Sequence, residues 1–348
     1  MSDNDFPSSD AIRKTEDQGL VFSGDKTILL ECINKAITEV VIPDGITAIG
    51  ANAFKNCKNL QNIEIPSGVT AIGEMAFGFC ESLISVKIPA SVTIIGDNAF
   101  YCCENLHNVK IPRRVAVIGQ YAFHGCNQLT SIVIPGTVAI IGGNAFSWCE
   151  NLRKITIKEG VAIIDSEAFA YCELLCSIKI PDSVQEIGYG TFEGCRCLKQ
   201  MHIPANITFI ADNTFKCCEL LTSVVIPEKV TSIGDEAFSC CNRLSSVIIP
   251  AGVKSIGKGA FSGCHFLDAV TIPSGVENIK KKTFAYCSHL TEVSLPQTIK
   301  KIGSKAFADC SELKKFIIPS CGTVIVKDAF SGAGCEEQVK RDYPHLFV

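Results

Sequence analysis

The chain has 348 residues and a formal net charge of −4, and 47% of its residues are hydrophobic while 20% are charged. This composition is too apolar for an intrinsically disordered protein, and the net charge is too small for a protein that binds polyanions through its overall charge. No apolar run approaches the roughly 18 residues of a membrane span, and residues 1–10 lack the basic and apolar regions of a secretory signal. We therefore expect either an intracellular protein or a chain that lacks its export segment, and we exclude a membrane enzyme.

The first 42 residues differ from the rest of the chain. Residues 1–20 are polar and are expected to form a flexible N-terminus. Residues 21–42 share with the following sequence only one short apolar alternation, Val40 and Ile42, so we predict that they form an N-terminal cap.

A 23-residue repeat fills residues 43–330. Phenylalanine recurs thirteen times from Phe54 to Phe330 with every gap equal to 23, and cysteine follows three residues later in twelve copies, from Cys57 to Cys310. A fixed period of this length is typical of solenoids, in which no repeat folds alone and each is stabilised by its neighbours. We therefore predict one cooperative array rather than two domains.

The elements of one repeat can be predicted from residues 53–73. Residues 62–65 alternate polar and apolar, as in a half-buried strand, and Pro66 ends the strand because it lacks an amide hydrogen. Residues 69–72 predict a second extended piece, and Gly73 suits a turn with positive φ. The Ala-Phe-x-x-Cys segment has room for about one helical turn. Stacking such repeats in parallel gives a curved solenoid.

The repeat pattern fails after Phe330. Ala333 stands in the cysteine position and Glu336 in the leucine position. Residues 331–348 are therefore predicted to form a C-terminal cap with a short helix whose apolar residues cover the last repeat.

The unit L-x-x-I-x-I-P-x-x-V-x-x-I-G-x-x-A-F-x-x-C resembles the BspA-type class of leucine-rich repeats over about residues 37–330. Leu60, Ile63 and Ile65 stand where the general L-x-x-L-x-L core stands. The resemblance implies an α/β repeat solenoid: a β-rich, right-handed leucine-rich-repeat superhelix with one parallel strand and a short helical turn per unit. It also implies a surface antigen or secreted protein that acts in protein binding and cell adhesion. The missing signal and the cysteine content keep a cytoplasmic location as the alternative.

The 20 cysteines divide into two sets. The twelve that follow the repeat are predicted to point inward as small apolar side chains. Cys217 and Cys240 lie one repeat apart and outside that set, which leaves open a disulfide or, as the favoured alternative, two free thiols. No C-x-x-C pair occurs, and we expect neither a metal site nor a cofactor.

The sequence offers no catalytic constellation. The six histidines occupy unrelated repeat positions, and no nucleophile, base and acid combine in a recognisable pattern. We therefore expect that the protein is not an enzyme.

The outward positions of the strands, on the concave face of the predicted solenoid, are the first candidate for a binding site, because curved solenoids usually bind there. These positions are basic in the first half of the array and small or apolar in the second, which suits a protein partner. Ordinary β-branched filling of strands and solvated lysines is the alternative. The candidate partner-binding residues are Lys87, Lys110, Arg153, Lys154, Lys179, Lys199, His202, Val225 and Ile248.

A lysine cluster in the last repeats is the second candidate. Stacking places these lysines together on the side away from the binding strands, where they would meet an anionic glycan, nucleic acid or lipid head groups. The alternatives to adhesion are therefore an anion-binding module or an intracellular scaffold of the same fold. The residues of this C-terminal lysine cluster are Lys254, Lys258, Lys280, Lys281, Lys282, Lys300, Lys301 and Lys305.

Overall fold

The computed structural model describes residues 13–15 and 19–348. The chain divides between Glu173 and Leu174 into two compact units, each of which is described by itself below. The flexible N-terminus predicted for residues 1–20 lies outside the described residues, apart from 13–15, 19 and 20. The predicted domain boundaries, the single cooperative domain and the superhelix stay predictions.

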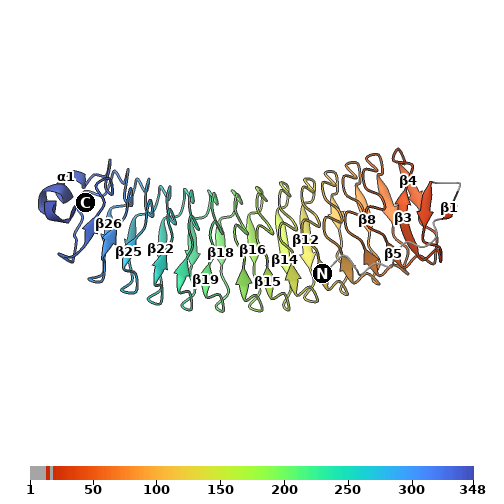
Figure 1. Ribbon diagram of the computed structural model, residues 1–348, viewed down its shortest axis with the longest axis horizontal. Helices are drawn as coiled ribbons and strands as arrows, with labels where there is room; N and C mark the ends of the chain where they lie inside the picture. Colours follow the sequence, from red (N-terminus) through yellow and green to blue (C-terminus); the bar gives the residue numbers. More distant parts are fainter. Residues whose placement is uncertain (1–12, 16–18) are drawn as a thin grey trace. The chain divides into compact units, whose positions relative to one another are not determined.

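The first unit begins with a small antiparallel sheet. β1 (Arg13–Thr15), β2 (Leu20–Phe22) and β3 (Ile28–Cys32) pair in this order, and β3 then pairs in parallel with β5 (Ala48–Ile49). Leu29 in β3 is fully buried. These strands therefore cover the first coil of the repeat array, where Figure 1 shows them in red.

Each 23-residue coil of the first unit contributes two parallel strands, which form two separate rows (Figure 1). We call the row whose strands mostly have three or four residues the long-strand row, and the row of two-residue strands the short-strand row. In the long-strand row the middle residue is buried between exposed neighbours, which confirms the predicted alternation. This row consists of β4 (Glu39–Val41), β6 (Asn62–Glu64), β8 (Ser85–Lys87), β10 (Asn108–Val109), β12 (Ser131–Ile134) and β14 (Lys154–Ile157). The short-strand row continues from β5 with β7 (Ala71–Ile72), β9 (Ile94–Ile95), β11 (Val117–Ile118), β13 (Ile140–Ile141) and β15 (Ile163–Ile164).

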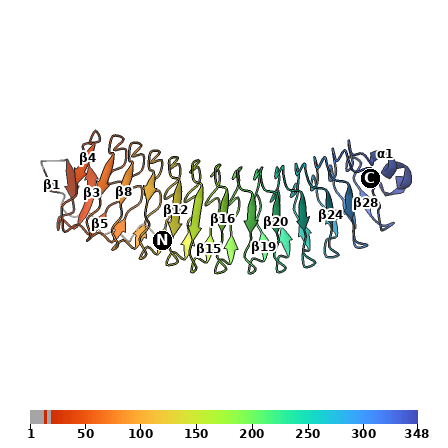
Figure 2. The ribbon, with the colours of Figure 1, turned by 180° about the vertical axis from the view of Figure 1, so that it is seen from behind.

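The second unit repeats this arrangement, and both of its rows can be followed from behind in Figure 2. Its long-strand row consists of β16 (Ser177–Lys179), β18 (Gln200–His202), β20 (Ser223–Val225), β22 (Ser246–Ile248), β24 (Ala269–Thr271) and β26 (Glu292–Ser294). Its short-strand row consists of β17 (Glu186–Ile187), β19 (Phe209–Ile210), β21 (Ser232–Ile233), β23 (Ser255–Ile256), β25 (Asn278–Ile279), β27 (Lys301–Ile302) and β28 (Val324–Ile325). The fold of each unit is thus a β-solenoid with parallel strands and little helix.

The segment predicted to form a helical turn is a run of tight turns, which corrects the sequence interpretation. In the coil around Phe54, the amide of Cys57 donates to the carbonyl of Phe54 at 3.0 Å, three residues earlier. Asn52 and Asn56 adopt the left-handed conformation with φ of 60° and 62°. A left-handed residue in third place is the geometry of a type II turn and interrupts a helix. We call residues 52–57, and their equivalents in other coils, the turn arc.

Bonds between coils explain why turns replace a helix. The amide of Phe54 donates to the carbonyl of Ala76 in the next coil at 2.7 Å, and Asn56 donates likewise to Gly78 at 2.9 Å. An α-helix would direct these amides along the chain and leave the neighbouring carbonyls without partners. The left-handed residues turn the amides toward the next coil, so the turn arc is hydrogen-bonded across the stack like the strands.

The glycines after the short strands serve close packing, and the positive φ predicted for them is wrong. Gly73 and Gly257 are not among the residues with positive φ. A Cβ atom built on Gly257 would lie 2.2 Å from the carbonyl oxygen of Gly234 and 2.4 Å from the amide nitrogen of Asp235. Glycine therefore occupies this position because consecutive backbones approach too closely for a side chain.

Columns of equivalent buried side chains form the core of each unit, among them a phenylalanine column and a cysteine column. Consecutive phenylalanine rings stack with centroids 5.1 to 5.7 Å apart between Phe54 and Phe169, and 5.2 to 5.7 Å apart between Phe192 and Phe330. The repeat cysteines are buried, which confirms their predicted place, and most of them donate a hydrogen bond to the carbonyl of the phenylalanine in the preceding coil. Cys126 Sγ, for example, donates to the carbonyl of Phe100 at 3.3 Å. Burial raises the pKa of the Cys126 thiol.

A short helix lies at the C-terminal end of the second unit (Figures 1 and 2), where the sequence predicts one. Helix α1 (Glu336–Asp342) buries Val339, and the 3-10 turn η1 (Pro344–Leu346) buries Leu346. Gln338 accepts a hydrogen bond from the amide of Phe316 at 3.0 Å and donates to its carbonyl at 3.2 Å. The side-chain amide thus takes the place that a further strand would fill.

Candidate functional site

The long strands expose two residues per coil on the outer face of their row, which we call the strand face. The burial pattern of β6, β8, β16, β18, β20 and β22 is exposed, buried, exposed. Alternating side chains point to opposite sides of a strand, so the outward residues of neighbouring coils form continuous columns. All of the predicted partner-binding residues lie on this face or beside its strands, and all are exposed.

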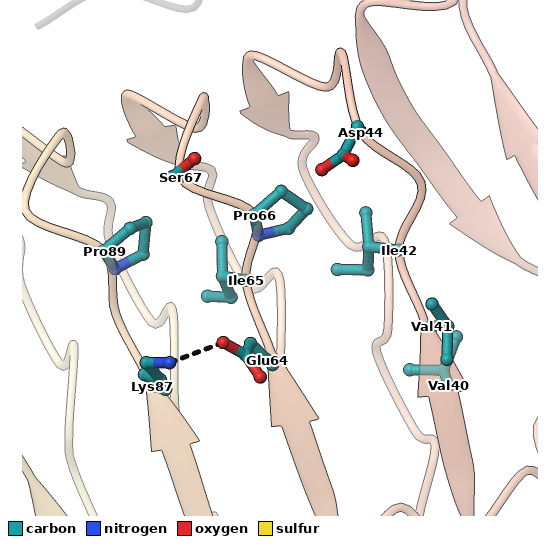
Figure 3. A pocket seen from close by; sticks show the side chains of 10 residues that line it. All are labelled: Val40, Val41, Ile42, Asp44, Glu64, Ile65, Pro66, Ser67, Lys87 and Pro89. Atoms are coloured by element: carbon teal, nitrogen blue, oxygen red, sulfur yellow. Dashed lines mark hydrogen bonds and ion pairs between the residues drawn. The ribbon is translucent and has the colours of Figure 1, made fainter.

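The first hollow on the strand face has mixed charge (Figure 3). It has a volume of about 440 Å³ and is lined by side chains that include Val41, Asp44, Glu64 and Lys87. Lys87 Nζ lies 2.5 Å from Glu64 Oε1 in the neighbouring strand. The opposite charge of Glu64 one coil earlier therefore offsets part of the positive charge predicted at Lys87, which stays a predicted partner-binding residue.

The second hollow lies farther along the same face of the first unit and is cationic. It has a volume of about 670 Å³, with Val109, Ile132 and Val133 among its apolar lining residues. It is also lined by four cationic residues, Lys87, Lys110, Arg113 and Lys158. In the described part of the chain no ion pair involves Lys110, Arg113 or Lys158. The hollow thus combines an apolar lining with three cations whose charge is uncompensated.

An irregularity of the long-strand row accounts for the position of the second hollow. β10 has only two residues and is hydrogen-bonded to β8 but not to β12. Beyond this seam the ladder is longer, because Lys158 replaces the usual proline and its amide donates to the carbonyl of Ile134 at 3.0 Å. Proline removes this donor in the other coils and ends their ladders earlier. The hollow opens where the short ladder meets the long one.

Arg153 and Lys154 lie outside both hollows. Both side chains are exposed, and Lys154 is aligned with Ser131 in the pairing of β12 with β14. They add positive charge to the strand face of the first unit, but the structure does not bring them among the residues that line the second hollow.

In the second unit the strand face changes from charged to apolar along its length. Register pairs Lys179 with His202, His202 with Val225, and Val225 with Ile248. Val225 and Ile248 are 70% and 81% exposed, although large aliphatic side chains are usually buried. Lys199 precedes β18 and is exposed. The predicted residues of this unit therefore form one row that ends in an apolar strip of Val225 and Ile248.

The C-terminal lysine cluster is partly neutralised. Lys258 Nζ lies 3.9 Å from Asp235 Oδ2, and Lys300 Nζ lies 2.8 Å from Glu277 Oε2. Lys280 donates to the hydroxyl of Ser255 at 3.1 Å. The remaining members, which are exposed and make no ion pair among the described residues, are Lys254, Lys281, Lys282, Lys301 and Lys305. Interspersed carboxylates make this surface less suited to an anion than the second hollow.

Sequence reasoning missed Arg113 as a residue of the candidate site. It follows Pro112 in the turn after the strand, so it belongs to neither outward column. Lys158 carried a usable signal, because it is the one departure from proline among the repeat positions that follow the long strands. In the residues that the structure covers, no group of three or more His, Cys, Asp or Glu side chains is arranged to hold a metal ion.

Comparison with protein families places the repeats in a known class. A model described as "BspA type Leucine rich repeat region (6 copies)" matches residues 31–146, 116–242 and 208–336. No curated protein sequence matches the chain. The three matched ranges overlap and together cover residues 31–336, which include the whole repeat array.

Solved structures resemble the chain over most of its length. A leucine-rich repeat protein from Bacteroides ovatus is 30% identical with a TM-score of 0.67, and the match covers 95% of this chain and 87% of that one. A leucine-rich cell surface protein from Faecalibacterium prausnitzii is 26% identical with a TM-score of 0.61, covering 88% and 94%. A leucine-rich repeat protein from Eubacterium ventriosum, 24% identical with a TM-score of 0.51 and coverage of 90% and 92%, shares the fold.

Proposed function

Because the chain belongs to the BspA type leucine-rich repeat family, we propose that it is a non-enzymatic binding protein of the adhesion type whose partner is another protein. The strand face is the proposed contact surface. Repeat solenoids present an extended surface of this kind, to which neighbouring coils contribute equivalent positions.

The observation that carries the proposal is the second hollow with its three uncompensated cations. Uncompensated charges at the edge of an apolar depression attract a partner of opposite charge and fix its orientation. The apolar lining formed by Val109, Ile132 and Val133 favours a partner with apolar side chains over a simple ion, because burial of apolar surface stabilises the complex. The partner segment is therefore an extended stretch that combines carboxylates with apolar side chains.

The apolar strip of the second unit supports the same function independently. Val225 and Ile248 lie side by side in β20 and β22 with most of their side-chain surface in contact with solvent. Exposed aliphatic neighbours flanked by the small residues Ser223 and Ser246 offer an unobstructed apolar surface to a partner.

A short fluorescein-labelled peptide of alternating glutamate and valine tests the proposal. Fluorescence polarisation should show binding to the full chain, and the double variant Lys110→Glu/Lys158→Glu should weaken it by about tenfold or more, which is at least about 1.4 kcal/mol. The matched control is Lys281→Glu/Lys282→Glu, which changes the net charge equally but lies outside both hollows. It should leave the affinity within about twofold.

Two results would contradict the proposal. Equal losses in both double variants would mean that the peptide senses only net charge. A larger loss of affinity in Lys281→Glu/Lys282→Glu would indicate that the peptide binds to the C-terminal lysine cluster, and it would favour the anion-binding alternative. Circular dichroism of each variant shows whether the fold is retained.

We also propose that the protein acts at the cell surface or outside the cell. The Faecalibacterium prausnitzii relative is described as a cell surface protein, and no helix within residues 13–15 and 19–348 is long and apolar enough to cross a membrane. Protease treatment of intact cells that produce the protein should cleave it while a cytosolic marker survives. Complete protection, with cleavage of a known surface protein in the same sample, would instead support an intracellular scaffold.

A further inference from the structure

Two cysteines outside the core occupy equivalent positions in consecutive coils, which no other accessible cysteines of the chain do. Of the 20 cysteines, 14 are buried, and the six that reach the surface are Cys102, Cys176, Cys197, Cys217, Cys240 and Cys321. Only Cys217 and Cys240 are 23 residues apart, so only they occupy the same place in consecutive coils.

The backbone holds these two residues in register. Both adopt the left-handed conformation of the turn arc, each with φ of 59°. The amide of Cys217 donates to the carbonyl of Ser239 at 2.8 Å, and the amide of Cys240 donates to that of Ser262 at 2.7 Å. Stacked coils are separated by about 4.8 Å, which lies within the Cα separation that a disulfide spans. Each thiol is also the largest single influence on the pKa of the other.

The surroundings leave the pair accessible. The same position holds bulky rings in other coils, such as Phe79, Trp148 and Tyr286, but glycine flanks the pair on both sides, at Gly194 and Gly263. A Cβ atom built on Gly263 would contact Cys240 Sγ at 3.5 Å. A larger side chain there would cover the sulfur, so glycine keeps one side of it open.

The environment also makes the two sulfurs unequal. The neighbouring Cys217 thiol lowers the pKa of the Cys240 thiol, assisted by the Ser239 hydroxyl at 3.8 Å and by the electrostatic influence of His265 and Lys216. The Cys240 thiol, together with partial burial, in turn raises the pKa of the Cys217 thiol. Since the thiolate is the nucleophile in exchange reactions, Cys240 is the attacking sulfur and Cys217 the resolving one.

We propose that Cys217 and Cys240 form a dithiol site that low-molecular-weight disulfides oxidise by thiol–disulfide exchange. Cys240 thiolate attacks one sulfur of the small disulfide, which forms a mixed disulfide and releases one small thiolate. Cys217 loses its proton to solvent and attacks the Cys240 sulfur, which forms the Cys217–Cys240 bond and releases the second thiolate. The protein loses two electrons and two protons, and the small disulfide is reduced to two thiols.

Oxidised glutathione, added to the full-length reduced protein, is the probe that tests this site. Free thiols are then alkylated, and the protein is digested with trypsin without reduction. Cleavage after Lys216, Lys229 and Arg243 places Cys217 and Cys240 on separate peptides. Mass spectrometry should show these two peptides joined through Cys217 and Cys240, with Cys218 and Cys241 alkylated after unfolding.

Variants separate the two steps. Cys217→Ser should stop at a stable glutathione adduct on Cys240, and Cys240→Ser should lose most of the reaction at Cys217. Cys102 has the same position in the turn arc, but the equivalent positions of the neighbouring coils hold Phe79 and Gly125, so Cys102→Ser should react like the wild type. Cys32 and Cys57 also influence each other's pKa, but both are fully buried, and this pair should stay reduced in the folded protein.

Three results would overturn the proposal. The first is alkylation of Cys217 and Cys240 after glutathione treatment to the same extent as Cys102. The second is a Cys240→Ser variant that reacts as fast as the wild type. The third is a bridge to Cys218 or Cys241 in place of the predicted one. Circular dichroism of both serine variants verifies that a lost reaction does not reflect a lost fold.

Discussion

Replacing Phe238 by alanine is expected to destabilise the second unit by about 3–5 kcal/mol. Phe238 has no exposed surface and stacks between Phe215 and Phe261, with centroids 5.2 and 5.3 Å away. The deletion removes ring contacts to two coils at once, and the hydrogen-bonded backbones of these coils restrict collapse of the cavity. Urea unfolding followed by circular dichroism measures the loss as a lower transition midpoint.

Phe266→Ala is the matched control for this prediction. Phe266 belongs to the same unit but is 53% exposed and lies outside the stacked column, although its ring rests on His289 at 4.9 Å. The control should cost less than about 1 kcal/mol, as surface substitutions generally do. If the two alanine variants unfolded at the same urea concentration, the phenylalanine column would not be the source of stability that its packing indicates.

Replacing Val339 by aspartate is expected to detach the C-terminal helix. Val339 is fully buried in α1, and burying an unpaired carboxylate there would cost several kcal/mol. The helix therefore leaves its place and exposes Phe316 and Phe330, which are 1% and 2% accessible in the intact protein. Loss of the Gln338 bonds also frees the backbone of Phe316. An exposed apolar edge self-associates, so size-exclusion chromatography should show oligomers.

The control for Val339→Asp is Glu337→Ala on the same helix. The Glu337 side chain is 89% exposed, and its ion pair with Lys340 spans 3.9 Å. This variant should elute as the wild type does. A Val339→Asp protein that remained as monodisperse as Glu337→Ala, with unchanged hydrogen exchange at Phe316, would show that α1 does not protect the last coils.

The sequence predicted the fold in its repeated parts because the same pattern occurs in every coil. Phe54, Cys57 and Ile63 have their equivalents every 23 residues, and burial of each column follows from a single alternation. The turn arc was mispredicted for the opposite reason. Its left-handed positions carry residues as different as Asn52, Met75 and Glu167, so no residue type marks them. The conformation is imposed by hydrogen bonds to the next coil, which no local sequence pattern encodes.

The candidate site was only partly predictable. The outward columns of the strand face follow from the strand alternation, and Lys110 was found in this way. The pairing of Lys87 with Glu64 depends on a side-chain contact between coils, although their opposite charges at neighbouring positions suit a cross-strand pair. The second hollow depends on the seam between β10 and β12, which is a property of hydrogen bonding and not of composition.

The bonds of the turn arc also make the two faces of a coil chemically different. Phe307 and Asp309 donate forward to Ala329 and Ser331, so each arc needs an acceptor on its C-terminal side. In the last coil a carboxylate fills this role, because the amide of Gly332 donates to Glu336 Oε2 at 2.8 Å. The hydrogen bonds of the turn arcs thus run in one direction, and Glu336 accepts the last of them. Homologues that differ in length are expected to gain or lose whole coils upstream of this carboxylate. A coil added beyond it would find the amide of Gly332 already bonded to Glu336.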